Sequence, residues 1–170
     1  MIADRDFVLR ARFDWTEGDE GVVVALGDHF AGMVLFAMDG ALHFTYQLWY
    51  RPIELAPIAL LPGEQDFVLD YRALGGRKGQ GRITLNGRVE ADAADLSPTL
   101  VRLPSGGLSV GINKRHAISE RYAARGTFRY SGRIDVVRIE PGAQPSDTPM
   151  LLDEAQVQAR MRAAAAGRAA

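Results

Sequence analysis

The stretch that decides the fold is residues 21–48, GVVVALGDHFAGMVLFAMDG followed by ALHFTYQL. It contains two apolar segments of strand length, a glycine at the corner between them and an Asp39-Gly40 pair of the kind that closes β-hairpins. Residues 22–26 and 33–38 are apolar at successive positions, which predicts strands that are covered on both faces. Closely spaced strands and tight turns of this kind indicate a β-sandwich and not an α/β enzyme.

The chain as far as residue 139 continues this pattern of short strands and turns. Asn86-Gly87 predicts a two-residue hairpin turn, and a phase slip near the end of the pattern predicts a β-bulge. No sustained helical period occurs before residue 139, so we predict a two-sheet antiparallel jelly-roll sandwich. The further strands are expected at 7–13, 42–48, 54–55, 67–71, 81–85, 88–91, 108–112 and 128–139.

Composition sets the broad class of the protein. The length of 170 residues suits one domain, and the net charge of −1 comes from 20 basic and 21 acidic residues that are mixed along the chain. We therefore expect no nucleic-acid partner. There is no apolar run long enough to span a bilayer and no signal peptide, so we expect no membrane partner and a cytoplasmic location by default. Without cysteine, disulfides and thiolate metal sites are excluded.

We predict a sandwich domain over residues 1–142 and a linker with a helical tail over residues 143–170. Asp153 is a suitable N-cap for that helix, with acidic residues in its first turn and arginines later. Its apolar stripe is thin, so the helix is expected to dock weakly.

Several spaced segments carry a resemblance to a known family. They are the stretch 21–48, the Leu61-Pro62-Gly63 turn, the glycine-rich GGRKGQGRITLNGR at 75–88 and the closing FRYSGRIDVVRIE at 128–140. Together they resemble the C-terminal accessory domain of bacterial arylsulfatases. The resemblance runs from about Asp6 to Glu140, and it implies a concanavalin A-like sandwich. It also implies docking to a sulfatase catalytic domain or a partner subunit, or formation of a homo-oligomer.

The catalytic motifs of that family are absent from this sequence. There is no C/S-x-P-x-R nucleophile motif, because Ser97-Pro98 places the proline directly after the serine, and the metal-binding Asp-Asp-x-Gly motif is missing. We therefore expect a non-catalytic accessory module, not an enzyme on its own, with no metal and no cofactor.

One strand face offers an alternative function. The alternation of residues 42–48 places His43, Thr45, Gln47 and Trp49 together on the face opposite the core, with Tyr50 and Arg51 next to them. Aromatic rings beside amide and imidazole groups are typical of sugar-binding sheets. The same side chains, above all His43, Gln47, Trp49, Tyr50 and Arg51, could instead dock a protein partner or bind nothing.

Glu90 and Asp92 form a second alternative. They alternate onto one face, as the two carboxylates of a jelly-roll glycoside hydrolase would. However, Asp95 stands where a glutamate is expected, and the segment runs into Leu96-Ser97-Pro98, so catalysis there is not our main interpretation. Other motifs lack their structural context, namely the G-x-S-x-G around Ser109, the glycines around Arg77 and Lys78, and the widely spaced His29, His43 and His116.

Overall fold

The computed structural model describes residues 2–49, 51–100, 106–114 and 116–146. Its strands are β1 (Phe7–Trp15), β2 (Gly21–Gly27), β3 (Ala31–Met38), β4 (Ala41–Leu48), β5 (Arg51–Glu54), β6 (Ile58–Ala59), β7 (Gly63–Gly75), β8 (Lys78–Leu85), β9 (Arg88–Asp95), β10 (Leu108–Val110) and β11 (Ile134–Pro141), and a 3-10 helix, η1 (Glu120–Arg125), precedes β11. No helix in these ranges is long and apolar enough to cross a bilayer.

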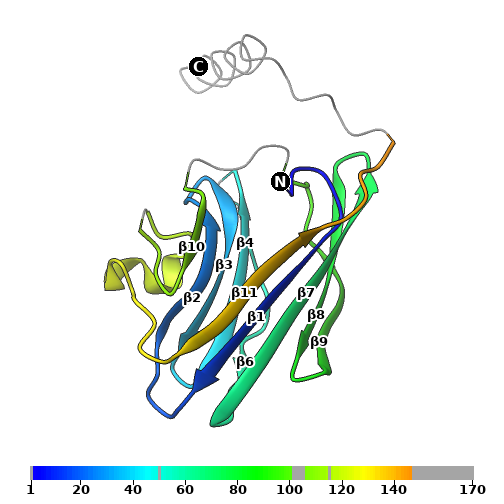
Figure 1. The fold of residues 1–170 in the computed structure, drawn as a ribbon. Coiled ribbons are helices and arrows are strands. Elements are labelled where there is room, and N and C mark those ends of the chain that lie inside the picture. Colours follow the sequence, from blue (N-terminus) through cyan, green and yellow to red (C-terminus); the bar gives the residue numbers. More distant parts are fainter. Residues whose placement is uncertain (1, 50, 101–105, 115, 147–170) are drawn as a thin grey trace, which may run out of the picture.

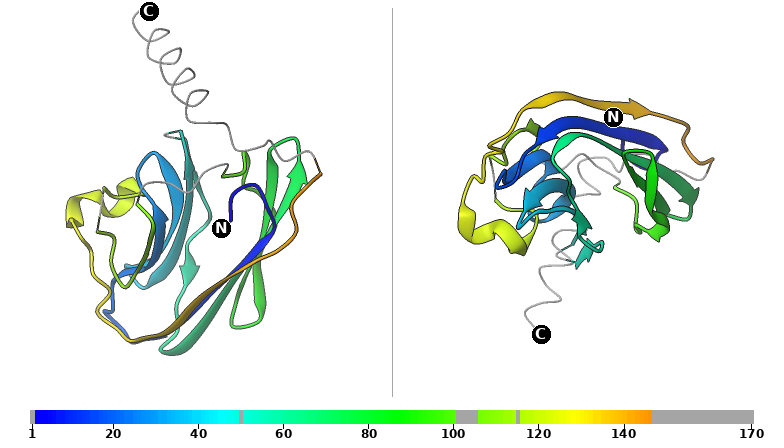
Figure 2. Two further views of the ribbon diagram at one scale, coloured as in Figure 1. Left: turned by 45° about the horizontal axis from the view of Figure 1, so that its top comes forward. Right: turned by 90° about the horizontal axis from the view of Figure 1, so that it is seen from below.

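The strands form two antiparallel sheets (Figure 1). The first sheet has the order β11-β1-β7-β8-β9, and the second has the order β10-β2-β3-β4-β5, with β6 paired to β4. Viewed from below in Figure 2, the two sheets follow an arc that is open on one side, with η1 outside the second sheet. The predicted all-β, two-sheet sandwich is confirmed.

The main core lies between the sheets, and β1 and β4 contribute to it by strict alternation. The inward residues of β1 are at most 4% exposed, and those of β4 at most 6%. Burying a side chain of this size stabilises the fold by about 1.5–3 kcal/mol. These inward residues are Phe7, Leu9, Ala11, Phe13 and Trp15 from β1 and Leu42, Phe44, Tyr46 and Leu48 from β4.

A second, smaller core covers the outer face of the β2–β3–β4 sheet. It packs Ile118, Tyr122 and Phe128, from the segment between β10 and β11, against the outward residues of β2 and β3. This cover explains why residues 22–26 and 33–38 are apolar at successive positions, and the prediction that these strands are covered on both faces is confirmed. The outward residues are Val22, Ala25, Val34 and Phe36.

Both predicted hairpin turns and the predicted bulge are present. Asp39-Gly40 has φ values of 51° and 73°, and Asn86-Gly87 has 52° and 78°, as two-residue turns with both positions left-handed require. The bulge lies at Asp135, because Arg12 pairs with Val136 whereas Phe13 pairs with Ile134.

Three predictions about the second half of the chain are wrong. The last strand begins at Ile134 and not at 128, because Phe128 turns over the second sheet instead. β10 ends at Val110, since Gly111 takes a φ of 72°. Helical structure does occur before residue 139, as the six-residue η1, whose Ser119 cap accepts a hydrogen bond from the Arg121 backbone N–H.

The C-terminal tail lies mostly outside the described residues. Its predicted helix, with Asp153 as the N-cap, falls entirely there and stays a prediction, as does the boundary between 1–142 and 143–170. Just before it, the chain is still tied to the N-terminal segment. The backbone N–H of Gly142 donates to Asp6 (2.7 Å), and that of Asp6 donates to Ala143 (2.8 Å).

Candidate functional site

The strand face predicted to bind a ligand is largely covered. His43, Thr45 and Gln47 do point away from the main core, but they are only 7%, 1% and 8% exposed. The alternation of β4 was therefore predicted correctly, and these three outward side chains are covered. The physical reason is the second core, which lies over the same face and leaves no room there for a ligand the size of a sugar.

His43 is held in place by contacts within the protein. Its ring stacks on Phe36, with centroids 4.9 Å apart and planes 8° from parallel, and its Nε2 lies 3.2 Å from the Met38 carbonyl oxygen. Burial lowers the pKa of His43, and the hydrogen bond to Met38 opposes that shift only in part. A neutral imidazole is therefore the form that the folded protein accommodates.

This lowered pKa predicts a loss of stability in acid. Below the ordinary value of 6.5 the unfolded chain takes up a proton at His43 before the folded chain does. Stability is thus fully present above pH 6.5 and falls as the pH drops from 6.5 toward the folded pKa, by at most about 1.4 kcal/mol per pH unit. Urea unfolding at several pH values, compared with His43→Gln, measures this. If the slope is the same in the variant, His43 is not its source.

Trp49 lies in a different setting, at the end of β4. It is 52% exposed and has a φ of 55°, which turns it out of the strand's alternation. Its backbone N–H donates to the Phe30 carbonyl (2.8 Å), and its ring meets the Phe30 ring edge-on, with centroids 4.8 Å apart. Of the neighbours predicted with it, Arg51 is exposed at the start of β5, and Tyr50 lies outside the described residues.

The β2–β3 turn gathers further polar groups beside Trp49. The Gln47 side-chain Nε2 donates to the His29 carbonyl (2.6 Å), and the His29 ring meets the His116 ring with centroids 4.9 Å apart. We call His29, Phe30, Gln47, Trp49 and His116 the Trp49 corner. Sequence spacing could not reveal this group, because its members come from three separate segments and only the fold brings them together.

The Trp49 corner combines an apolar aromatic surface with hydrogen-bonding groups. A pyranose has an apolar ring face and a rim of hydroxyls, so it needs both kinds of contact. The Gln47 Oε1 and the Thr45 Oγ1 are buried without a hydrogen-bond partner among the described residues. Both atoms lie on the covered face of β4, where a sugar has no room, so we do not count them as ligand contacts.

Glu90 and Asp92 do not form a catalytic pair. Both carboxylate oxygens of Glu90 accept hydrogen bonds from Arg88, at 2.7 and 3.1 Å, and the Arg88 guanidinium lowers the pKa of Glu90. A general acid needs the opposite shift. Asp92 is exposed and lies 3.9 Å from Arg82. Glu90 does line a cleft of about 160 Å³ at the open side of the sandwich, but the other lining residues are mainly apolar core side chains.

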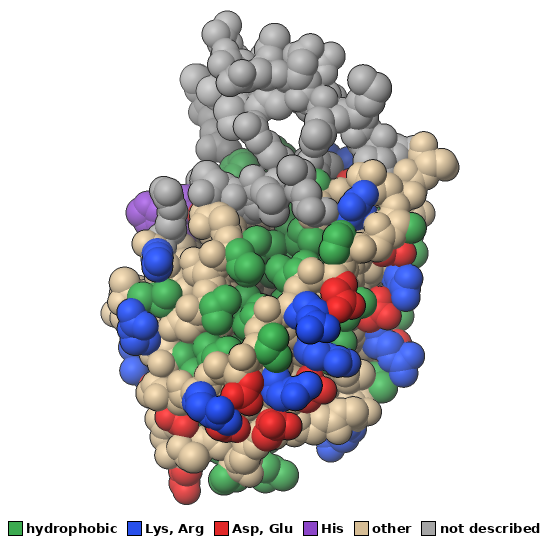
Figure 3. Space-filling model, viewed as in Figure 1, with side chains coloured by type: hydrophobic (Ala, Val, Ile, Leu, Met, Phe, Trp, Pro, Cys, Tyr) green, Lys and Arg blue, Asp and Glu red, His purple; other side chains and the backbone are tan. Residues whose placement is uncertain are grey.

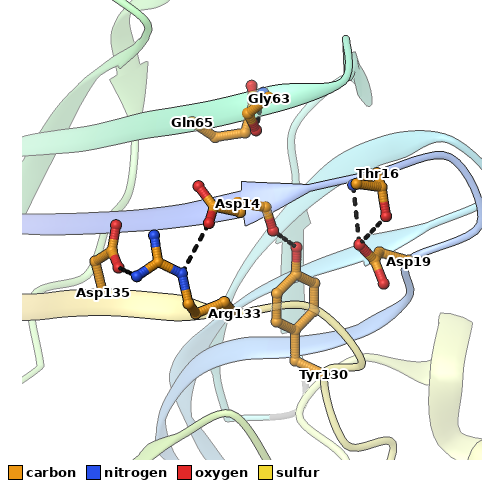
Figure 4. A network of polar contacts seen from close by, with 8 residues as sticks. All are labelled: Asp14, Thr16, Asp19, Gly63, Gln65, Tyr130, Arg133 and Asp135. Atoms are coloured by element: carbon orange, nitrogen blue, oxygen red, sulfur yellow. Dashed lines mark hydrogen bonds and ion pairs between the residues drawn. The ribbon is translucent and has the colours of Figure 1, made fainter.

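A group of three carboxylates was not predicted from the sequence. Oxygens of Asp14, Glu64 and Asp135 lie within 4.8 Å of one another. As Figure 4 shows, the Arg133 guanidinium reaches two of them, Asp14 Oδ2 and Asp135 Oδ1, both at 2.8 Å. The positive charge that these carboxylates attract is thus already supplied by Arg133, and we assign no metal to this group.

Charges of both signs are interspersed over the face shown in Figure 3, below and to the right of a central group of hydrophobic side chains. On the outside of the first sheet they form pairs such as Arg10 with Asp66 (3.6 Å). Elsewhere on the surface, Leu108 and Val110 of the edge strand β10 are 52% and 45% exposed.

Comparisons with known proteins identify similar folds but no family for this chain. No family model matches the sequence, and no curated protein matches it. The structure is similar to the IT-sialidase CBM40 of Ruminococcus gnavus, with a TM-score of 0.58 and 14% identity over 85% of this chain and 80% of that one. The same module bound to α2,3-sialyllactose gives a TM-score of 0.53 at 14% identity, over 88% and 82% of the two chains.

A leech intramolecular trans-sialidase is also similar, with a TM-score of 0.57 and 14% identity. The match covers 92% of this chain but 23% of that larger protein. At such low identities these likenesses show the fold alone, a β-sandwich shared with carbohydrate-binding modules. None of these three structures is an arylsulfatase, so the resemblance to the sulfatase accessory domain stays a prediction.

Proposed function

We propose that this protein is a non-catalytic carbohydrate-binding module that holds its glycan at the Trp49 corner. The observation that carries the proposal is the exposed Trp49 ring, which packs on Phe30, next to the paired rings of the partly exposed His29 and the exposed His116. These groups supply the stacking surface and the hydrogen-bonding groups that a sugar ring requires. The proposal keeps Trp49 from the strand face predicted from the sequence and replaces the covered His43 and Gln47 with the two histidines of the corner. The Gln47 side chain holds the His29 backbone in place (2.6 Å).

The fold likeness supports the same proposal. The similar Ruminococcus gnavus modules are carbohydrate-binding modules, and structures of that module are described as bound to α2,3- and α2,6-sialyllactose. A non-catalytic role also agrees with the lowered pKa of Glu90. The sulfatase-accessory function rests on sequence resemblance, and the exposed Leu108 and Val110 are the surface that would serve a docking partner.

Replacing Trp49 with alanine should weaken glycan binding by about tenfold or more, because the ring's stacking surface is lost. The measurement is isothermal titration calorimetry of the purified chain against a panel of neutral and acidic oligosaccharides. Leu61→Ala is the matched control, since Leu61 is also a large exposed apolar residue, 75% accessible, but lies outside the corner. It should bind like the wild type.

Two results would argue against this function. If a glycan binds equally well to Trp49→Ala, the site lies elsewhere. If no glycan binds and light scattering shows a dimer, the docking function gains support instead.

A further inference from the structure

Arg77, in the turn between β7 and β8, has an unusual environment for an arginine. Gly75, Gly76 and Arg77 have successive φ values of 82°, 55° and 61°, and such left-handed backbone is uncommon for a residue other than glycine. The Arg77 side chain is partly buried. Its Nε and Nη2 atoms are inaccessible to solvent and have no hydrogen-bond partner among the described residues.

Burying two nitrogens of a guanidinium without hydrogen-bond partners is costly. Arginine stays protonated at any physiological pH, so it cannot avoid the cost by losing its charge. Charges removed from water are normally paired with an opposite charge or hydrogen-bonded. Even Arg72, Arg88 and Arg133, whose side chains are exposed to water, each contact a carboxylate at 3.1 Å or less. Arg77 therefore has the donors of an anion site but no anion from its own chain in the described part.

The two unpartnered nitrogens lie on the same edge of the guanidinium. Nε and Nη2 point their N–H groups in one direction, at a spacing that matches the two oxygens of a carboxylate or two oxygens of a sulfate. The combination of edge geometry, charge and burial favours a planar or tetrahedral oxyanion over a neutral acceptor.

Arg77 lies at the same end of the sandwich as the Trp49 corner. The Thr99 backbone N–H donates to the Arg77 carbonyl (2.9 Å), and the Tyr46 hydroxyl donates to the neighbouring Pro98 carbonyl (2.8 Å). Tyr46 precedes Trp49 by three residues, about 10 Å along an extended chain. In Figure 1 the β7–β8 turn and the end of β4 are both at the top of the molecule.

The N-terminal segment brings two further charged side chains to this end, where the Asp4 backbone N–H donates to the Leu100 carbonyl (2.6 Å). Asp4 is a carboxylate that is 4% exposed, and it accepts a hydrogen bond from the Thr99 hydroxyl (2.5 Å). Arg5 adds a second guanidinium, whose buried Nε also has no hydrogen-bond partner in the described ranges. Two guanidinium groups therefore accompany one buried carboxylate.

We propose that Arg77 binds the acidic group of a glycan, a carboxylate or a sulfate, while the Trp49 corner holds the neighbouring sugar ring. This inference rests on the proposed function and narrows it to acidic oligosaccharides. Arg77 contributes the charge-assisted, two-point contact, and Trp49 contributes the apolar stacking contact.

The test compares matched ligands by calorimetry at low and moderate salt. Lactose is the neutral probe, 3′-sialyllactose carries a carboxylate, and 3′-sulfolactose carries a sulfate. We expect the better acidic ligand to bind about tenfold or more tightly than lactose, because the charge-assisted contact is added. The advantage should shrink as salt rises. Which acidic ligand binds better identifies the anion.

Arg77→Gln should remove this advantage and leave lactose binding unchanged, whereas Arg77→Lys should retain part of it, since the charge stays and the two-point edge is lost. Lys78→Gln is the control, because it removes the same charge from the exposed next residue. As a probe that needs no sugar, sulfate at matched ionic strength should raise the melting temperature of the wild type more than that of Arg77→Gln.

The possible failures are distinguishable. If glycans bind through Trp49 but acidic and neutral ligands bind equally, and sulfate stabilises both proteins alike, the anion site is wrong and the proposed function stands. If no glycan binds but sulfate stabilises only the protein with Arg77, the anion site stands and the glycan function is wrong. If Arg77→Gln loses lactose as well, Arg77 acts on the shape of the site and not on an anion.

Discussion

Tyr122→Ala should lower the free energy of unfolding by about 3–5 kcal/mol, as expected for emptying the space of a fully buried aromatic side chain. Tyr122 has no exposed surface, and its ring packs against Phe36 and Phe128 at centroid distances of 4.9 and 5.6 Å. Its hydroxyl also accepts hydrogen bonds from the Asn113 side chain (3.0 Å) and the Ile118 backbone (3.1 Å). The alanine variant therefore loses both packing and two buried hydrogen bonds.

Tyr122→Phe separates these two contributions, since it keeps the ring and removes the acceptor of the Ile118 N–H, whereas the Asn113 side chain still donates to the His116 carbonyl (3.1 Å). It should cost about 1–3 kcal/mol. Urea unfolding followed by circular dichroism measures both variants. Should Tyr122→Ala cost less than 1 kcal/mol, the segment around η1 would not be an integral cover of the sheet, and the outer face of β4 would again be available to a ligand.

Gly21→Ala should destabilise the protein by about 3 kcal/mol or more, because it combines backbone strain with a collision. Gly21 has a φ of 123°, and a Cβ there would overlap the backbone carbonyl of Arg129. The segments around Gly21 and Arg129 are held close by a backbone hydrogen bond on either side. The Val22 N–H donates to the Phe128 carbonyl and the Ser131 N–H donates to the Glu20 carbonyl, both at 2.9 Å. A methyl group would have to separate them.

Gly18→Ala is the control for the strain alone. Gly18 also has a positive φ, 92°, but nothing lies within 4 Å of the position its Cβ would take. It should cost about 1–2 kcal/mol. The melting temperatures of the two variants measure the two effects. Gly18→Ala shows the loss caused by backbone strain alone, and Gly21→Ala shows the loss caused by strain and collision together. Equal losses would mean that the close approach of residues 128–131 to β2 contributes little.

The sheets were predictable because their signals are local. The alternation of β1 and β4 and the Asp39-Gly40 and Asn86-Gly87 turns each depend on a few successive residues, and each appears in the structure as expected. Even the bulge at Asp135 left a mark in the sequence, as a change in which residues share a face.

The candidate site was predictable only in part. Local alternation correctly placed Gln47 on the outward face of β4, but what covers that face depends on Ile118, Tyr122 and Phe128, about 70 to 80 residues further along. His29 and His116 are likewise distant in sequence, and no spacing rule connects them. The unpartnered nitrogens of Arg77 depend on how a whole end of the sandwich packs, which no pattern of neighbouring residues reports.

The cover over the second sheet also bears on how this protein can change during evolution. Because β2, β3 and β4 are covered on both faces, the proposed recognition falls to the connections at one end of the strands. There the β2–β3 turn, the residue after β4 and the β7–β8 turn carry His29, Trp49 and Arg77. Substitutions in such connections do not disturb either core. New ligand preferences could therefore arise by changing loops one at a time, while the framework that supports them keeps its stability.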